Sequence, residues 1–166
     1  MSHPALDKRQ TWSELSDIVT TNTLHRLGRS RSDLSIYKDY MDNVRSQWHS
    51  LADYIALEKF PGFTRIKTVQ DGEEKYSLDP PLTDNGLGII VSLKKNDFPY
   101  HITDDVEHWV VWVLNRNVSD EDLEDGKRQL REKFGSVSEF LSWINPDNLK
   151  SVPELSHAHI FVRKAK

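Results

Sequence analysis

The sequence predicts a single α+β domain in which a mainly antiparallel sheet is packed by one long helix near the N-terminus and by two shorter helices. Between residues 34 and 55, apolar side chains recur at alternating spacings of three and four, which is typical of one face of a helix. After residue 63 the pattern changes to strand-like alternation, and no βαβ repetition or internal repeat is present. The length of 166 residues is that of one ordinary domain.

The long helix is expected to begin at Ser32 or Asp33, either of which can cap it, and to end at Pro61-Gly62. Its apolar face is rich in aromatic residues and lasts only about three heptads, so it is interpreted as core-facing rather than as a coiled-coil seam. The residues of this face are Leu34, Tyr37, Met41, Val44, Trp48, Leu51 and Ile55.

Five later segments are expected to be strands. They cover residues 63–69, 75–78, 88–93, 108–114 and 155–163. The first two flank Asp71-Gly72, a dipeptide typical of a tight hairpin turn. The segment that begins at His108 is apolar on both faces, so we expect it to lie at the covered centre of the sheet.

The two shorter helices are expected between the last two strands. One runs from Ser119 to Gly135, and the other from Ser136 to Asn145. Each starting serine is followed three positions later by an acidic residue, which is the capping-box pattern of a helix start.

Residues 1–30 are polar, and we expect them to form a partly ordered arm attached to the domain over residues 31–166. Docking of this arm through Trp12 is one interpretation. A regulatory segment is the other, because a phosphate on Ser30 or Ser32 would lie beside three arginines.

The composition excludes several classes of protein. There is no cysteine, which excludes disulfides, thiolate metal sites and a cysteine nucleophile. The net charge of −4 does not favour nucleic acid as a partner. No apolar run approaches the roughly 18 residues of a membrane span, and the N-terminus does not resemble a signal peptide. The expected location is therefore the cytoplasm, with the nucleus as a further possibility, and the cofactor and oligomeric state are left open.

The C-terminal strand carries the main candidate site. Strand alternation places His157, His159 and Arg163 on one face and Ile160 on the other. Imidazoles act as bases or nucleophiles near neutral pH, and a guanidinium suits phosphate. We therefore assign His157 and His159 as candidate catalytic residues and Arg163 as a ligand-binding residue. The alternative is a structural role on a partly solvated sheet face.

Five further residues are candidate ligand-binding groups. Asn145, Lys150 and Ser151 belong to a loop just before the C-terminal strand, and loops at strand ends commonly carry binding groups. The same loop is also rich in ordinary turn formers. His108 opens the central strand, where it lies beside the last strand if the two pair, and Tyr100 precedes it.

A metal site is a separate hypothesis. His108, His157 and His159, with Asp104 or Glu107 nearby, could bind zinc or iron if they share a sheet face. We assign no metal ligand, because the histidine spacing alone is a weak signal. Phosphate-binding glycine loops and serine hydrolase signatures are absent.

Four parts of the chain resemble the fungal N-acetylglucosamine-induced protein family, a domain of unknown function. They are Asn96–Tyr100, His108 with Trp112, Asn145–Pro153 and His157–Arg163, within a match expected over roughly residues 35–166. The resemblance implies a protein of the amino-sugar response, in the cytoplasm or the nucleus, and it implies no catalytic residues.

The same landmarks are similar in order to the histidine-triad nucleotide-binding superfamily. That resemblance places the nucleophilic histidine at His157, the last triad histidine at His159 and the following basic residue at Arg163. Leu155 stands where the first triad histidine would be, so one member is missing. The resemblance implies a phosphate-facing pocket.

The leading hypothesis is therefore a small-molecule ligand, either a nucleotide, a sugar phosphate or an amino sugar, bound at the sheet face that carries the histidines. If the protein is an enzyme, phosphoryl or nucleotidyl transfer is expected, with His157 as nucleophile and Arg163 and Lys150 holding the phosphate. A non-enzymatic regulator of the amino-sugar response and a metal-dependent enzyme are the alternatives.

Overall fold

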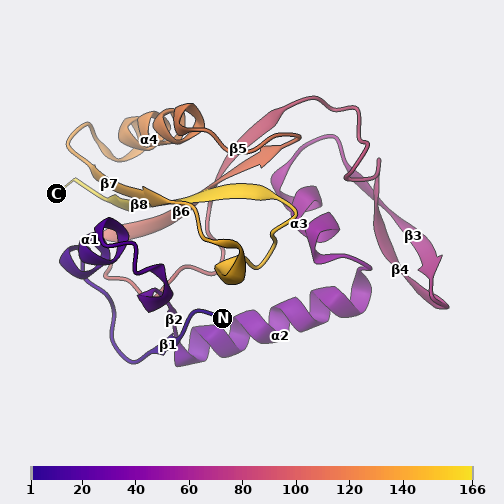
Figure 1. The fold of residues 1–166 in the computed structure, drawn as a ribbon, viewed down its shortest axis with the longest axis horizontal. Coiled ribbons are helices and arrows are strands. Elements are labelled where there is room, and N and C mark those ends of the chain that lie inside the picture. Colours follow the sequence, from indigo (N-terminus) through magenta and orange to yellow (C-terminus); the bar gives the residue numbers. More distant parts are fainter. Residues whose placement is uncertain (1, 166) are drawn as a thin grey trace.

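A four-stranded antiparallel sheet, with helices on both of its faces, organises residues 2–165 of the computed structural model (Figure 1). The elements in chain order are β1 (Ala5–Leu6), α1 (Trp12–Thr20), η1 (Leu24–Arg26), β2 (Arg29–Ser30), α2 (Arg31–Gln47), α3 (Leu51–Lys59), β3 (Thr64–Gln70), β4 (Glu73–Asp79), β5 (Ile90–Lys95), β6 (Val106–Leu114), α4 (Asp120–Phe134), β7 (Glu139–Trp143), η2 (Asp147–Leu149) and β8 (Ser156–Arg163). Across residues 2–165, every helix falls short of the length and apolarity that crossing a bilayer requires.

The sheet has the strand order β5-β6-β8-β7, so β6 and β8 form its centre. Their antiparallel register pairs Val110 with His159 and Trp112 with His157. Paired residues share a face of the sheet. The α4 helix covers one face, and α1, α2 and α3 lie on the other side (Figure 1).

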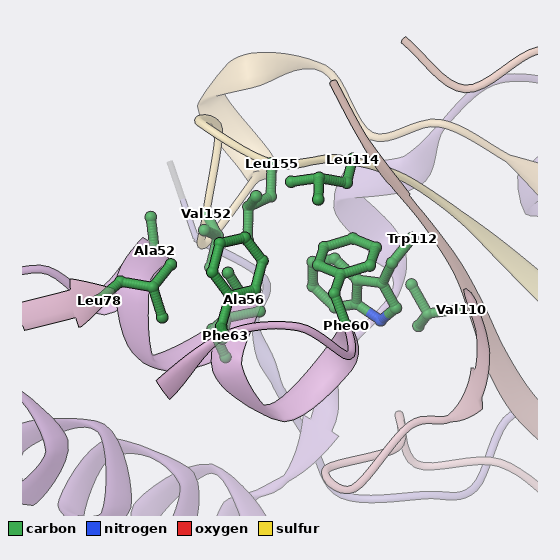
Figure 2. Close-up of a cluster of buried hydrophobic side chains, with 11 residues drawn as sticks. Ala52, Ala56, Phe60, Phe63, Leu78, Val110, Trp112, Leu114, Val152 and Leu155 are labelled. Carbon is green, nitrogen blue, oxygen red and sulfur yellow. The ribbon is translucent and has the colours of Figure 1, made fainter. Parts of the chain in front are cut away.

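Each face of the sheet has its own apolar packing. On the α4 side, Leu130 packs with Val111 and Ile160 of the central strands. On the opposite side, residues of α3 and β4 pack against Val110 and Trp112 of β6, as Figure 2 shows. The α+β class and the buried central strand predicted from the sequence are confirmed.

Local sequence signals located several elements correctly. The hairpin β3–β4 turns at Asp71 and Gly72, which both have positive φ, as the sequence predicts. The α4 helix begins after Ser119, which forms a capping box with Asp122. These elements depend on short-range chemistry, which the sequence displays directly.

The single long helix predicted over residues 32–61 is wrong, because the chain forms two helices there. Trp48 adopts extended backbone angles, φ −119° and ψ 142°, between α2 and α3. The N–H of His49 donates to the carbonyl of Tyr76 in β4 at 3.1 Å. Ser50 then caps α3 by accepting a hydrogen bond from the N–H of Asp53. Pairing with the distant hairpin therefore interrupts a helical apolar pattern.

The helix predicted between Ser136 and Asn145 is also wrong, because this segment forms the edge strand β7. Leu141 is paired with Phe161 of β8 in the antiparallel register. The capping-box pattern at Ser136 therefore has no helix to cap. The edge of β8 provides the backbone hydrogen bonds that a helix would otherwise make internally. Tertiary pairing therefore outweighs the local preference for a helix.

The N-terminal residues contribute to the core. Leu15 and Ile18 of α1 are fully buried in one cluster with Tyr100 and Phe161. A short parallel pairing joins β1 to β2, and it lies beside α2. The boundary expected at residue 30 stays a prediction, and the burial of α1 supplies a way to test it.

We expect Leu15→Ala to lower the free energy of unfolding by about 2–5 kcal/mol, because it leaves a cavity in this cluster. The measurement is urea unfolding followed by tryptophan fluorescence. Ile36→Ala is the control: Ile36 is 59% exposed, so the change should stay within about 0.5 kcal/mol. A loss below about 1 kcal/mol for Leu15→Ala would favour an arm that is separate from the core.

Candidate functional site

A pocket of about 110 Å³ lies between the central strands of the sheet and the helices α2 and α3. Its aromatic walls come from α2, α3, the β5–β6 connection and β6. They are Tyr37, Tyr40, Tyr54, Phe98, Tyr100 and Trp112. Its polar floor includes His3, Arg29, Asn145, His157 and His159. The pocket therefore combines stacking surfaces with several hydrogen-bonding groups.

A buried imidazole pair lies beneath the pocket. His108 Nε2 and His159 Nδ1 are 2.8 Å apart, and the two side chains are 1% and 7% exposed. Trp143 stacks on the His159 ring at 5.0 Å between centroids. The register of β6 and β8 brings the two histidines together across 51 positions of sequence.

Burial lowers the pKa of both His108 and His159 well below the usual histidine value. The positive charge of Arg29 lowers both pKa values further, since a second cation nearby disfavours protonation. Both imidazoles are therefore neutral at pH 7.

His157 has a defined tautomer. Its Nδ1 lies 2.8 Å from the carbonyl oxygen of Leu155, so Nδ1 carries the proton and donates it. In a neutral ring this leaves a lone pair on Nε2, for which residues 2–165 supply no hydrogen-bond partner. Burial lowers the pKa of His157, and Trp112 stacks on its ring at 4.5 Å between centroids.

Arg29 lines the pocket, and the sequence analysis did not identify it as a site residue. Its Nε donates to the carbonyl of Phe98 at 2.9 Å, and its guanidinium lies 4.1 Å from the ring centre of Tyr37. No carboxylate of residues 2–165 forms an ion pair with it. The only sequence signal is the arginine-rich stretch around residue 30, for which the sequence leaves a docked arm and a regulatory segment as alternatives.

His3 is a second pocket residue that the sequence analysis missed. Its Nδ1 donates to the carbonyl of Leu27 at 2.9 Å, and its Nε2 accepts the hydroxyl proton of Tyr100 at 2.9 Å. Burial lowers the pKa of His3 to about 4. Nothing local marks this histidine, because its partners lie 24 and 97 positions away.

The structure brings several of the sequence-predicted site residues together. His157, His159, Asn145, Tyr100 and Ser151 all line the pocket. His108 lies behind them and contacts the pocket through its bond to His159. The Ser151 hydroxyl accepts a hydrogen bond from Tyr37 at 2.8 Å, which connects the loop to α2.

Two predicted residues lie elsewhere. Arg163, at the end of β8, pairs with Asp105 at 3.3 Å and with Glu139 at 3.7 Å. Lys150 pairs with Asp147 at 2.8 Å and lines a different hollow, beside the β3–β4 hairpin. The separation follows from position: Arg163 is six residues beyond His157, so it reaches the far end of the strand.

The three histidines of the metal hypothesis share a sheet face, but two of them use their facing nitrogens to bond each other. Nowhere in the described part of the chain do three or more His, Asp or Glu side chains converge in an arrangement suited to a metal ion. The geometry therefore favours hydrogen bonding over metal ligation at His108 and His159.

Comparisons with known proteins identify a family and two curated relatives. The family model described as Protein of unknown function (DUF3605) matches residues 11–163, so the match begins well before the expected residue 35. The chain is 26% identical to N-acetylglucosamine-induced protein 1 of Candida albicans, over 92% of this chain and 68% of the relative. It is 24% identical to the uncharacterized protein YPL067C of Saccharomyces cerevisiae, over 91% of this chain and 77% of that protein.

A solved structure has the same fold. The structure titled "Crystal Structure of HTC1" aligns with a TM-score of 0.57 over 93% of this chain and 85% of its own, at 20% sequence identity. The likeness at this identity concerns the fold alone.

The buried histidines predict how stability depends on pH. Their folded pKa values lie below the roughly 6.5 of an unfolded histidine, so between these values the unfolded state binds more protons. Stability is therefore complete above about pH 6.5 and falls as the pH drops toward 4, by up to about 1.4 kcal/mol per pH unit for each buried histidine.

Urea unfolding at half-unit pH steps measures this slope. We expect His159→Gln to reduce the slope between pH 6.5 and 4, and we expect His25→Gln, at an exposed position, to leave it unchanged. Protonation of Asp122 also lowers the stability of the protein in acid. Because the Arg116 hydrogen bond lowers the pKa of Asp122 in the folded state, that loss of stability begins only below about pH 4. An equal slope in His159→Gln and the parent would contradict a neutral buried His159.

Proposed function

Because the chain belongs to the DUF3605 family of proteins of unknown function, we propose a function from the pocket itself: it binds a small phosphorylated ligand, of which a sugar phosphate is the favoured class. The observation that carries this proposal is the Arg29 guanidinium, which lines the pocket without a carboxylate partner among residues 2–165. A partly buried cation without a counterion is costly, and an anionic ligand offsets that cost.

The walls of the pocket favour a ligand with one ring. Tyr37, Tyr40 and Trp112 line it with aromatic side chains, which suit contact with either a sugar ring or a base. A water takes about 30 Å³ of liquid volume, so a cavity of about 110 Å³ holds roughly four waters. That space suits a phosphorylated monosaccharide better than a dinucleotide.

Carboxylates at the same pocket favour a ligand that also carries hydroxyl or amino groups. Glu58 and Asp97 both line it, and Asp97 pairs with Lys59 at 3.2 Å. These acceptors could bind the donors of an amino sugar. The name of the Candida relative, an N-acetylglucosamine-induced protein, agrees with this class. A role in the amino-sugar response, in the cytoplasm or nucleus, is part of the same proposal.

A ligand panel tests the binding. We expect glucosamine 6-phosphate or adenosine monophosphate to raise the melting temperature of the parent, since a ligand at 100 times its Kd adds about 2.7 kcal/mol. Arg29→Gln should weaken the binding measured by calorimetry by about 10- to 150-fold, which corresponds to 1.5–3 kcal/mol for hydrogen bonds to a charged group.

Arg163→Gln is the matched control, because it removes the same kind of side chain at the end of β8, outside the pocket. Its affinity should equal that of the parent. If Arg163→Gln loses affinity and Arg29→Gln does not, the ligand binds at the far end of β8 and the pocket proposal is wrong.

A second candidate function is group transfer with His157 as the nucleophile. The lone pair on Nε2 and the fixed tautomer favour it, because a neutral nitrogen without a partner among residues 2–165 is available to attack phosphorus. The resemblance to the histidine-triad superfamily supports the same role for His157.

We expect the parent to release phosphate or nucleoside from a panel of phosphate esters, and we expect His157→Gln to bind the same compounds without turning them over. The measurement is product release followed by chromatography, with binding measured in parallel. Binding without turnover in the parent would assign the pocket to a non-enzymatic sensor instead.

A further inference from the structure

At its His108 end, the buried imidazole pair faces a hydrogen-bond donor. The N–H of Tyr100 points at His108 Nδ1 from 3.3 Å. The amide of Asn96 also faces this nitrogen, at 3.4 Å, and its orientation is set because its oxygen accepts the N–H of Phe98 at 2.9 Å. Both neighbours of His108 Nδ1 are therefore donors.

A donor also faces the His159 end of the pair. Asn145 lies with its amide nitrogen 3.2 Å from His159 Nε2. Its oxygen accepts the indole N–H of Trp143 at 2.9 Å, and an indole nitrogen can only donate. This bond sets the orientation of the Asn145 amide.

Counting protons shows that the pair has one donor too many. Two neutral imidazoles carry two protons on four nitrogens. The central contact of 2.8 Å uses one proton, and a lone pair on His108 Nδ1 accepts from Tyr100. The second proton then lies on His159 Nε2, where it meets the amide protons of Asn145. Turning the Asn145 amide over would only move the conflict to Trp143.

The surplus donor lies at the wall of the pocket. His159 and Asn145 both line it, and they are only 7% and 4% exposed. Trp143, by contrast, does not line the pocket, so no ligand could relieve a conflict there. A buried donor without an acceptor destabilises the protein, and an acceptor placed in the pocket would remove that destabilisation.

We infer that His159 Nε2–H and Asn145 Nδ2–H together bind an acceptor oxygen of the ligand, either a carbonyl or a phosphoryl oxygen, at a position separate from the Arg29 guanidinium. This inference rests on the proposed function in one respect, namely that the pocket is the ligand site. It adds that the ligand presents an unprotonated oxygen to a neutral donor pair, and that an ammonium group is rejected at this position.

The tautomers of the free protein test the first step and require no ligand. Long-range proton–nitrogen NMR correlations of the histidine rings should show His108 and His159 both protonated at Nε2. A His159 protonated at Nδ1 would overturn the inference. A failure of phosphate binding would leave this result unaffected, so the two proposals can fail separately.

Three probes test the acceptor site: inorganic phosphate, N-acetylglucosamine and glucosamine 6-phosphate. We expect a saturable shift of the His159 Nε2–H resonance with at least one of them. A shift with N-acetylglucosamine but not with phosphate assigns a carbonyl oxygen, and the reverse assigns a phosphoryl oxygen. No shift with any probe overturns the inference.

Asn145→Asp provides a test by substitution, because a carboxylate can accept from Trp143 and from His159 Nε2–H at once. We expect the melting temperature of the free protein to be kept and the probe-induced shift of His159 to be lost. Asn85→Asp is the matched control: the buried Asn85 amide donates to Leu82 and Asn115, so losing those bonds should lower the melting temperature. An equal loss of stability in both variants would overturn the inference.

Discussion

The antiparallel pairing of β6 with β8 is the constraint on which the rest of the structure depends. Its register places His108, Val110 and Trp112 on the same face as His157, His159 and Phe161. The opposite face, with Val111 and Ile160, is covered by α4. One pairing therefore decides which side chains form the core under α4 and which ones line the pocket.

The pocket exists because the helical conformation is interrupted between α2 and α3. The separate helices α2 and α3 bring Tyr37 and Tyr54 to the same pocket, whereas one straight helix would carry the two residues along a single line. The interruption is held by the contact of Trp48 and His49 with Tyr76 of the hairpin. The β3–β4 hairpin, whose β3 strand is largely exposed, thus has a structural role in shaping the site.

The chemistry of the site follows from burying histidines beside a cation. Burial and Arg29 keep His108 and His159 neutral, so they act as hydrogen-bond donors and acceptors rather than as charges. The positive charge of the pocket then comes from the Arg29 guanidinium and from Lys59 and Lys95, which are paired with Asp97 and Glu107. The pocket therefore combines cationic side chains with neutral hydrogen-bonding groups.

The sequence by itself determined the features that short-range chemistry controls. The alternation of β8, the capping box of α4 and the Asp71-Gly72 turn depend on residues within a few positions of one another, so their patterns are visible in the chain. The same alternation correctly placed His157 and His159 on one face.

Only the tertiary structure decided where the helices are interrupted and which cation faces the histidines. Backbone hydrogen bonds to β8 made a strand of residues 139–143, and contact with Tyr76 divided the long helix. Arg29 reaches the pocket by bonding the carbonyl of Phe98, which lies 69 positions away, while Arg163 is directed to Asp105. Such long-range contacts leave no local periodicity, because their free energy depends on surfaces that exist only after the chain has folded.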